Sequence, residues 1–481
     1  MRKKIFVALA GVFIALILVI AVVSIILENN NIRWKGNRSY VSCFEELFKD
    51  MEEHYALSMH KEIDWNLLYD RFLPRFERAQ ENESKEEFVD AMFDFTQAFH
   101  DSHIIIDDYG EKLTGSPSSV LEERKKERFI SCYDFAVFQL LDGTFIAVNV
   151  IEGGVAHEAG IQDGDEIISW NKKTVEEAME ELPLCPPLLR WNFANEENEK
   201  YLKPLYLTVM SKECLTVGLS DGRTVTMKSR GNGYEYAKDT MSLLLTRVNK
   251  GENLYYEEGM MHYEVREDYA YLCVSNLGSH EGTEFEQELP LLKAEMEQKD
   301  SLFLLLDLRN NSGGYDDRGA ELLSYFTGED IFYLSENRYQ KETGYTHERD
   351  IWVKGKGMFD LPVIILVNSQ TVSAGEAFSY RMQELPNVTV IGASRTNGSL
   401  ATYEDSTVLP EGIMIHFPTL ACMEQDGSIL IDSGVGQAGG IEPDVFIPRD
   451  RTFAERMFEN NYNGDYELEF AIEYEKKSAG N

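Results

Sequence analysis

Hydrophobic and polar positions change their period along the chain and so divide it into parts. Between residues 40 and about 110, apolar residues recur at three- and four-residue steps, the period of one helix face. Phe44, Leu47 and Phe48 follow this period in one stretch, and Phe88 and Met92 follow it in another. The pattern predicts a small helical domain over residues 38–112.

From about residue 130 the apolar runs become short and strand-like, as in FAVFQL and TFIAVNVI, with Asp-Gly and Gly-Gly turns between them. This indicates a compact β-rich module over residues 130–232. Its stretch Gly154–Ile168 resembles the most recognisable part of a PDZ domain, a module that takes an extended peptide as an added strand. The alternative is a fragment of a β-sandwich in which the glycines only form turns.

Beyond residue 260 continuous apolar strands alternate with amphipathic helices. The runs DYAYLCVSN, SLFLLLDLR, LPVIILVNS and VTVIGAS are typical of buried strands, and the segments between them are helical. The fold class is therefore α/β, within a multidomain α+β chain, with a mainly parallel sheet in a core over residues 260–450. We expect residues 451–481 to form a peripheral acidic tail.

The first residues have a different character. Residues 5–27 contain no charge, and at about 1.5 Å per residue they would span roughly 35 Å, enough for a bilayer core of about 30 Å. Arg2, Lys3 and Lys4 precede the run and favour a cytoplasmic N-terminus. Residues 1–29 are thus predicted to form a cytoplasmic tip and a single-pass anchor in the cell membrane, with the rest extracytoplasmic. A cleaved leader is the alternative, although its apolar core would be shorter.

Charge excludes one class of partner. The chain has 46 Lys and Arg residues against 83 Asp and Glu residues, a net charge of −37. Such a surface repels phosphate backbones, so we expect no nucleic-acid partner. The six cysteines show no CxxC and no zinc spacing, and no phosphate-binding glycine loop is present, so we expect neither a metal nor a cofactor. An isolated disulfide between two of the cysteines stays possible.

Two segments of the α/β part are placed where chemistry usually occurs. Ser373 follows a buried strand and opens a helix, where free backbone N–H groups can stabilise an oxyanion. Gly313 and Gly314 also follow a strand, and glycines allow close approach of the backbone. The alternatives are structural: a serine that caps its helix, and an ordinary turn.

A serine nucleophile needs a base. No lysine occurs between Lys356 and Lys476, which excludes a lysine base close behind Ser373. Among the nine histidines, His103 is the best candidate because it lies just past a helix end, next to small polar residues. Taken alone, a histidine at such a position more often caps the helix than acts as a base.

Several motifs, taken together in their order, resemble the tail-specific, C-terminal-processing serine proteases, and specifically their tricorn-like (Ser-His) branch. The resemblance covers most of residues 40–448. Its motifs are a tyrosine followed by D-W-x-x-L-Y-D-R, then D-S-H, the PDZ-like insert, D-L-R-x-N-x-G-G, S-A-x-E, T-x-G-S, L-P-x-G, D-G-S and G-G-I-E-P-D. They stand at Tyr55, Asp64–Arg71, Asp101–His103, Asp307–Gly314, Ser373–Glu376, Thr396–Ser399, Leu409–Gly412, Asp426–Ser428 and Gly439–Asp444.

This resemblance implies an α/β core of the crotonase-like, ClpP-like type and assigns roles to individual residues. Ser373 would be the nucleophile and His103 the general base. Ser102 would position the histidine through a fourth, acidic residue. The oxyanion hole would consist of the backbone amides of Ala374 and of Gly313 or Gly314.

The sequence departs from the family at that fourth residue. Where the relatives carry a glutamate, this chain has Gln437, which can form a hydrogen bond but cannot stabilise an imidazolium as a carboxylate does. Asp432 or Glu442 could take its place.

The resemblance implies a membrane-anchored serine endopeptidase that acts on protein or peptide substrates, which the PDZ-like module would hold. The departure at Gln437 leaves two rivals open. One is an inactive binding protein or scaffold on the same fold, as in the retinoid carriers of the retina. The other is an esterase or other acyl hydrolase.

Overall fold

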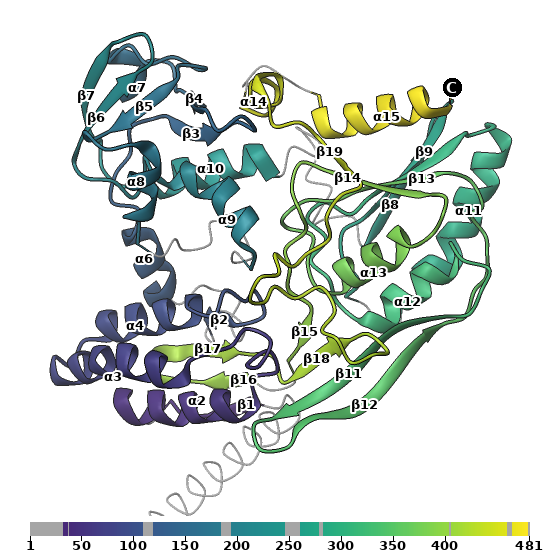
Figure 1. Ribbon diagram of the computed structural model, residues 1–481, viewed down its shortest axis with the longest axis horizontal. Helices are drawn as coiled ribbons and strands as arrows, with labels where there is room; N and C mark the ends of the chain where they lie inside the picture. The colour runs from purple at the N-terminus through teal and green to yellow at the C-terminus, as the bar shows by residue number, and fades with distance from the viewer. Residues whose placement is uncertain are drawn as a thin grey trace, which may run out of the picture.

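The computed structural model describes residues 32–36, 38–108, 119–183, 194–245, 260–278, 282–403, 406–458 and 464–479. The apolar run at residues 5–27 lies outside these ranges. Within them, no helix combines the length and the apolar character that crossing a membrane requires. Figure 1 shows three groups of elements, with the helical domain and the β-rich module on one side and the α/β core on the other.

Three helices form the N-terminal domain: α2 (Tyr40–His54), α3 (Trp65–Glu81) and α4 (Lys85–Gln97). Ser39, Asp64 and Ser84 cap them by accepting hydrogen bonds from backbone N–H groups of the first turn. The apolar repeats place aromatic rings on the inner faces, and the rings of Phe44 and Phe76 stack with centroids 4.3 Å apart. The same cluster contains Leu409 and Ile413, so the helical domain shares its core with the C-terminal half of the chain.

The helical domain shares a sheet with the C-terminal half of the chain. Strands β1 (Ile32–Trp34) and β2 (Ile105–Asp108) flank β16 (Ser406–Val408) and β17 (Ile413–His416) in the order β1-β16-β17-β2. The short helix η2 (Pro410–Gly412) joins β16 to β17. Figure 1 shows β16 and β17 beside the purple helices. This sheet therefore holds residues 32–34 and residues 406–416 next to the segment that follows α4.

The β-rich module contains two small sheets, as the short apolar runs predict. Strands β3 (Ala136–Gln139) and β4 (Phe145–Val148) form a hairpin, and β5 (Ile167–Trp170), β6 (Cys214–Leu219) and β7 (Thr224–Lys228) form an antiparallel sheet. The helices in and around it are α6 (Ser119–Glu127), α7 (Val155–Glu158), α8 (Val175–Glu180), α9 (Glu196–Leu202), η1 (Lys203–Tyr206) and α10 (Tyr234–Leu245).

The α/β core is built on a six-stranded sheet with the order β19-β14-β13-β10-β9-β8. All neighbours are parallel except the edge strand β8. The strands are β8 (Met261–Val265), β9 (Tyr269–Val274), β10 (Phe303–Asp307), β13 (Val363–Leu366), β14 (Val388–Gly392) and β19 (Val445–Phe446). The four apolar runs predicted as buried strands are β9, β10, β13 and β14.

Each face of this sheet is covered by its own hydrophobic cluster. One face packs against α11 (Glu284–Gln298), α12 (Asp316–Ser324) and α13 (Ala374–Gln383). The other packs against α10, the hairpin β3–β4, α14 (Arg451–Phe458) and α15 (Tyr466–Ala479). Because both faces are covered, the strands read as continuous apolar runs.

The C-terminal residues differ from the expected peripheral tail. Phe453, Met457 and Phe458 of α14 are buried in the cluster that covers the sheet. Glu467 of α15 forms an ion pair with the buried Arg309 at 3.0 Å. The acidic residues here are partly structural, and α14 and α15 belong to the core.

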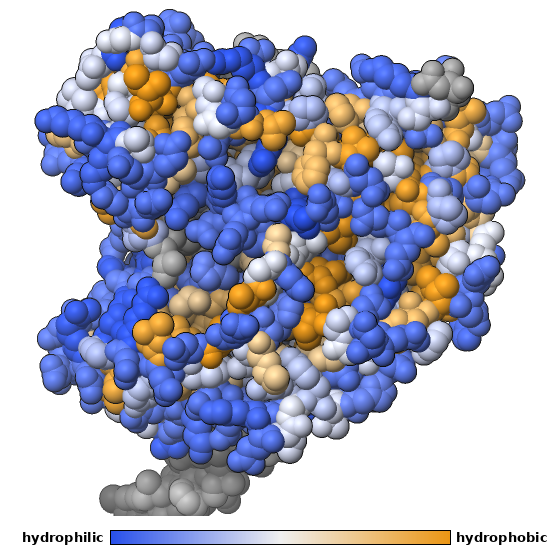
Figure 2. Space-filling model, in the orientation of Figure 1, coloured by the Kyte–Doolittle hydropathy of each residue, from blue (hydrophilic) through white to orange (hydrophobic). Residues whose placement is uncertain are grey.

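A second sheet of the core has the order β12-β11-β18-β15. Its strands are β11 (Ile331–Gln340), β12 (Gly344–Val353), β15 (Ala401–Thr402) and β18 (Leu420–Met423). The long hairpin β11–β12 forms the lower edge of the molecule in Figure 1. Figure 2 shows that apolar surface on this face gathers over the core, whereas the helical domain and the β-rich module present mainly hydrophilic residues.

Candidate active site

Three neighbouring parallel strands direct their carboxyl ends toward one place. The loop after β10 carries Gly313 and Gly314, the loop after β13 carries Ser373, and the loop after β14 carries Ser399. Parallel strands end at the same edge of a sheet, where α/β folds usually bind their ligands. Residues far apart in sequence therefore meet at this edge.

Ser373 has an unusual backbone conformation. Its φ is 61° and its ψ is −133°, a region that residues with a side chain rarely adopt. It stands between the loop after β13 and the first residue of α13. Strained residues of this kind persist only where surrounding contacts hold them, and they cluster at functional sites. The sharp turn presents the hydroxyl at the helix N-terminus.

His103 meets Ser373 from the other end of the chain. Nε2 of His103 lies 3.0 Å from Oγ of Ser373, although 270 residues separate them. His103 lies in the segment between α4 and β2, and its side chain is buried. The serine and the histidine that the sequence selects thus lie within hydrogen-bond distance.

The other ring nitrogen of His103 contacts Ser399 rather than Ser102. Nδ1 lies 2.7 Å from Oγ of Ser399, and that hydroxyl donates to Oδ1 of Asp101 at 2.8 Å. Because the Ser399 proton points to the carboxylate, its oxygen accepts from Nδ1–H. Nε2 then carries no proton and can accept the one from Ser373. This is the tautomer that a general base requires.

Asp101 is held by three donors. Besides Ser399, it accepts from the backbone N–H of His103 at 2.8 Å and from the hydroxyl of Tyr55 at 2.8 Å. Its side chain is buried beside the histidine. Burial lowers the pKa of His103 below its ordinary value of 6.5, and the negative charge of Asp101 opposes that shift. The imidazole is therefore neutral near pH 7.

The remaining predicted site residues lie in different places. Ser102 donates to the side-chain oxygen of Asn397 at 2.7 Å. Gln437 lies on an exposed loop, where its backbone bonds to Gly434 and its side chain makes no hydrogen bond to any described residue. The structure thus does not bring Gln437 to Ser102.

The two acidic residues that could take the place of Gln437 also lie in different environments. Glu442 is exposed and pairs with Arg395. Asp432 is buried; its Oδ1 accepts from the backbone N–H of Leu400 at 3.0 Å, and its Oδ2 has no hydrogen-bond partner. Burial and the nearby charge of Asp101 raise the pKa of Asp432 well above its usual range. Asp101, reached through Ser399, is the carboxylate linked to His103.

The glycine pair lies against Ser373. A side chain at Gly313 would come within 2.5 Å of Cβ of Ser373, so only glycine fits there. The amide of Gly313 donates to Oδ1 of Asn311 at 2.8 Å, whereas the amides of Gly314 and Ala374 donate to no described residue. Of the three predicted oxyanion donors, Gly314 and Ala374 thus have unengaged N–H groups.

A buried carboxylate joins the serine turn to the loop after β14. Glu376 accepts from the backbone N–H groups of Ser373 at 3.2 Å, Gly398 at 2.7 Å and Ser399 at 3.1 Å. The hydroxyl of Thr396 donates to it at 2.6 Å. Burial raises the pKa of Glu376 to about 7, against the effect of these donors. Glu376 fixes Ser373 and Ser399 relative to each other.

Sequence reasoning did not assign roles to Asp101, Ser399, Asn397 and Glu376. All four lie within or next to the motifs D-S-H, S-A-x-E and T-x-G-S. Their place inside these motifs was the available signal. No group of three metal-ligating side chains occurs in the part of the chain that the structure describes. No disulfide joins two of the five described cysteines, and Cys185 lies outside the described residues.

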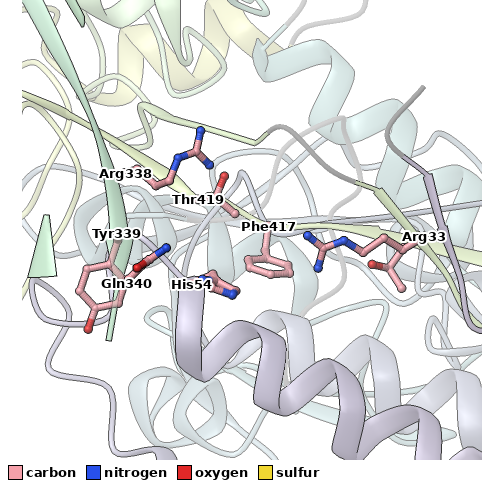
Figure 3. A pocket seen from close by; sticks show the side chains of 8 residues that line it. Arg33, His54, Arg338, Tyr339, Gln340, Phe417 and Thr419 are labelled. Carbon is pink, nitrogen blue, oxygen red and sulfur yellow. The ribbon is translucent and has the colours of Figure 1, made fainter. Parts of the chain in front are cut away.

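A separate pocket lies away from this site. Its volume is about 120 Å³, and Figure 3 shows Arg33, His54, Arg338 and Phe417 among the side chains around it. Arg33, His54 and Arg338 lie within 4.0 Å of Asp50, Glu53 and Glu348, respectively. None of the residues around Ser373 lines this pocket.

Comparison with known proteins shows which family the α/β core resembles. Residues 268–447 match peptidase family S41. This match covers less than half of the chain. Its match to the carboxy-terminal processing protease CtpB of Bacillus subtilis is 22% identical over 311 residues, which cover 63% of this chain and 54% of that protein. A probable CtpA-like serine protease of Staphylococcus epidermidis is 27% identical over 146 residues, 30% of this chain and 27% of that protein.

The chain thus spans about half the length of CtpB and less of the CtpA-like protein. The resemblance to C-terminal-processing proteases seen in the sequence is confirmed by these matches. Among solved structures, mature CPAF complexed with lactacystin aligns with a TM-score of 0.57 at 14% identity. That alignment covers 92% of this chain and 98% of CPAF. At 14% identity, this alignment shows that the chain and CPAF share a fold.

Proposed function

We propose that the protein is a serine peptidase that hydrolyses peptide bonds of protein substrates through an acyl-enzyme on Ser373. The observation that carries this proposal is the continuous hydrogen-bond chain from Ser373 through His103 and Ser399 to Asp101. A nucleophile, a base in hydrogen-bond contact and a group that orients the base are the parts that nucleophilic catalysis needs. The match of residues 268–447 to peptidase family S41 supports peptides as the substrates.

In the first half-reaction, Nε2 of His103 takes the proton of the Ser373 hydroxyl while Oγ attacks the carbonyl carbon of the peptide bond. The imidazolium is stabilised by Asp101 through Ser399. The amides of Gly314 and Ala374, at the turn and at the N-terminus of α13, would stabilise the oxyanion. When the tetrahedral intermediate collapses, the C–N bond breaks and Nε2 returns the proton to the leaving amine.

In the second half-reaction, water attacks the acyl-enzyme and gives a proton to Nε2. The ester bond to Oγ then breaks, and the proton passes back to Ser373. The product is a free carboxylate, and the serine and neutral histidine are restored. This Ser-His mechanism needs no lysine, in agreement with the absence of lysine between residues 356 and 476.

The argument for an inactive binding protein rested on Gln437. If Asp101 supplies the negative charge that stabilises the imidazolium, catalysis does not need a carboxylate at position 437. Asp101 is linked to the imidazole through Ser399, and Gln437 is not. An acyl hydrolase that prefers small esters would use the same residues, so substrate choice separates it from a peptidase.

We further propose that residues 5–27 anchor the protein in the cell membrane, with residues 1–4 cytoplasmic and the S41 domain extracytoplasmic. The uncharged run and the basic residues before it support this placement. The β-rich module over residues 130–232 is proposed as a PDZ-like site for an extended substrate segment, on the basis of its sequence and its small antiparallel sheets.

A fluorophosphonate probe tests the nucleophile directly. Full-length protein in detergent would be labelled as wild type, Ser373→Ala and His103→Ala, and the modified peptide identified by mass spectrometry. We expect one label on Ser373 in the wild type, none in Ser373→Ala, and labelling at least 100-fold slower in His103→Ala. Labelling of Ser373→Ala at the wild-type rate would refute the assignment.

A further inference from the structure

We propose that helix α9 (Glu196–Leu202), which lies outside the S41 match, positions the active-site loop through Asn195 and Asn198. The loop over residues 395–399, after β14, carries Asn397 and Ser399. The functional consequence rests on the proposed peptidase activity, but the contacts themselves do not depend on it.

The two asparagines hold three consecutive carbonyl groups of this loop. Nδ2 of Asn195 donates to the carbonyl oxygens of Thr396 at 2.9 Å and Asn397 at 3.0 Å. Nδ2 of Asn198 donates to those of Arg395 at 3.2 Å and Thr396 at 2.9 Å. Both asparagine side chains are 3% exposed. A buried carbonyl without a donor is costly, so these bonds select one conformation of the loop.

The opposite side of the loop faces the catalytic residues. The N–H groups of Gly398 and Ser399 and the hydroxyl of Thr396 donate to Glu376. The loop thus lies between two sets of partners, with Glu376 on one side and α9 on the other. Its position sets where Ser399 meets Nδ1 of His103 and where Asn397 meets Ser102.

The far end of α9 is anchored in the β-rich module. The rings of Tyr201 and Phe138, a residue of β3, pack edge to face with centroids 5.7 Å apart. Leu202, Leu205 and Tyr206 are buried in the same cluster as Phe138. The helix therefore joins the module to the loop, and the geometry of His103 depends on the docking of an element that the S41 match does not include.

Asn195 also caps α9, because its Oδ1 accepts from the backbone N–H of Asn198 at 2.8 Å. A purely structural cap and a clamp on the loop can be separated by Asn195→Asp. Aspartate caps a helix as well as asparagine does but has no amide donor. Asn198→Ala removes the second pair of donors. Glu196→Gln is the matched control, because Glu196 is an exposed residue of the same helix and forms no ion pair with a described residue.

Two measurements on the full-length protein test the proposal. The first is the fluorophosphonate labelling rate of Ser373 against pH, at temperatures well below each variant's unfolding. The second is hydrogen exchange of the backbone amides of residues 396–400 by mass spectrometry. We expect Asn195→Asp and Asn198→Ala to label at least tenfold more slowly, with a shifted midpoint of the pH profile. We also expect exchange at least tenfold faster in these two variants, with Glu196→Gln unchanged in both measurements.

Wild-type labelling rates, midpoint and exchange in both asparagine variants would overturn the clamp and leave the peptidase assignment intact. If the wild type itself is not labelled, the proposed function fails, and the exchange measurement alone decides whether the asparagines hold the loop. Faster exchange with an unchanged labelling rate and midpoint would show that the asparagines stabilise the loop without positioning His103, and would also overturn the proposal.

Discussion

Oγ of Ser399 lies 2.7 Å from Nδ1 of His103, although 296 residues separate the two in sequence. The Ser399 hydroxyl also donates a hydrogen bond to Asp101 and so links the carboxylate to the imidazole. The usual place of the carboxylate in a Ser-His-Asp arrangement is taken here by a serine, with the aspartate behind it.

Replacing Ser399 or Asp101 in this hydrogen-bond chain is expected to lower kcat and to leave KM nearly unchanged. Asp101→Asn should reduce kcat by roughly 10²–10⁴-fold, because the imidazolium loses its counter-charge. Ser399→Ala should reduce it by at least about tenfold. Gln437→Ala is the control, and its exposed side chain predicts a change of less than about twofold. Steady-state kinetics on a peptide substrate measure all three. A larger loss of kcat in Gln437→Ala than in Asp101→Asn would contradict the role of Asp101 in orienting and stabilising His103.

The pH dependence of kcat/KM should report His103. The base must be neutral, so activity is absent at low pH and rises as the imidazolium loses its proton. Burial lowers the pKa of His103, which places the midpoint of this rise below 6.5. The measurement is kcat/KM between pH 4.5 and 8. A midpoint above 7 would mean that the histidine is solvated or that another group controls the rate.

Asp316, the first residue of α12, should make the protein less stable as pH rises. Burial raises its pKa from 3.8 to about 7, and its Oδ1 has no hydrogen-bond partner. The folded state therefore binds this proton more tightly than the unfolded state. The stability that the proton contributes is complete below about pH 4 and is lost as pH rises through 7.

We therefore expect Asp316→Asn to stabilise the protein at pH 8 relative to pH 5, by up to about 3 kcal/mol. Urea unfolding of wild type and variant at the two pH values measures this difference. An equal effect of the substitution at both pH values would show that the carboxyl does not titrate in this window.

Arg309 should be needed for the fold of the core. Its guanidinium is 2% exposed and pairs with Asp307 at 2.6 Å, Asp465 at 2.7 Å and Glu467 at 3.0 Å. Arg309→Met leaves these carboxylates without a counter-charge and should reduce the free energy of unfolding by about 3–5 kcal/mol. Urea unfolding measures the loss. A change below about 1 kcal/mol would mean that water reaches the carboxylates and that α15 is loosely held.

Much of the core could be predicted from sequence because its signals are local. The strands β9, β10, β13 and β14 are continuous apolar runs, and the helices between them have one apolar face. Ser373 and His103 could be selected because each stands at the end of such an element, and the family motifs linked them. Their separation by 270 residues made the contact itself a hypothesis until the fold placed them together.

The remaining parts depend on long-range pairing that leaves no local signal. Asp465 and Glu467 are typical of a solvated tail in sequence, but the buried Arg309 binds them. Ser399 looked like one residue of a motif, and its role depends on the position of Asp101 almost 300 residues earlier. The family motif pointed to Gln437 as the fourth residue. In the folded chain, the carboxylate linked to His103 is that of Asp101, which comes from the helical domain.

The central claim is that Ser373 and His103 form a working peptidase site. Full-length wild type, Ser373→Ala and His103→Ala would be incubated with an unfolded protein, and the products analysed by mass spectrometry. The account predicts fragments from the wild type and a rate lower by about 10⁴–10⁶-fold in Ser373→Ala. Equal cleavage by wild type and Ser373→Ala, or no cleavage by a folded wild type, would contradict it.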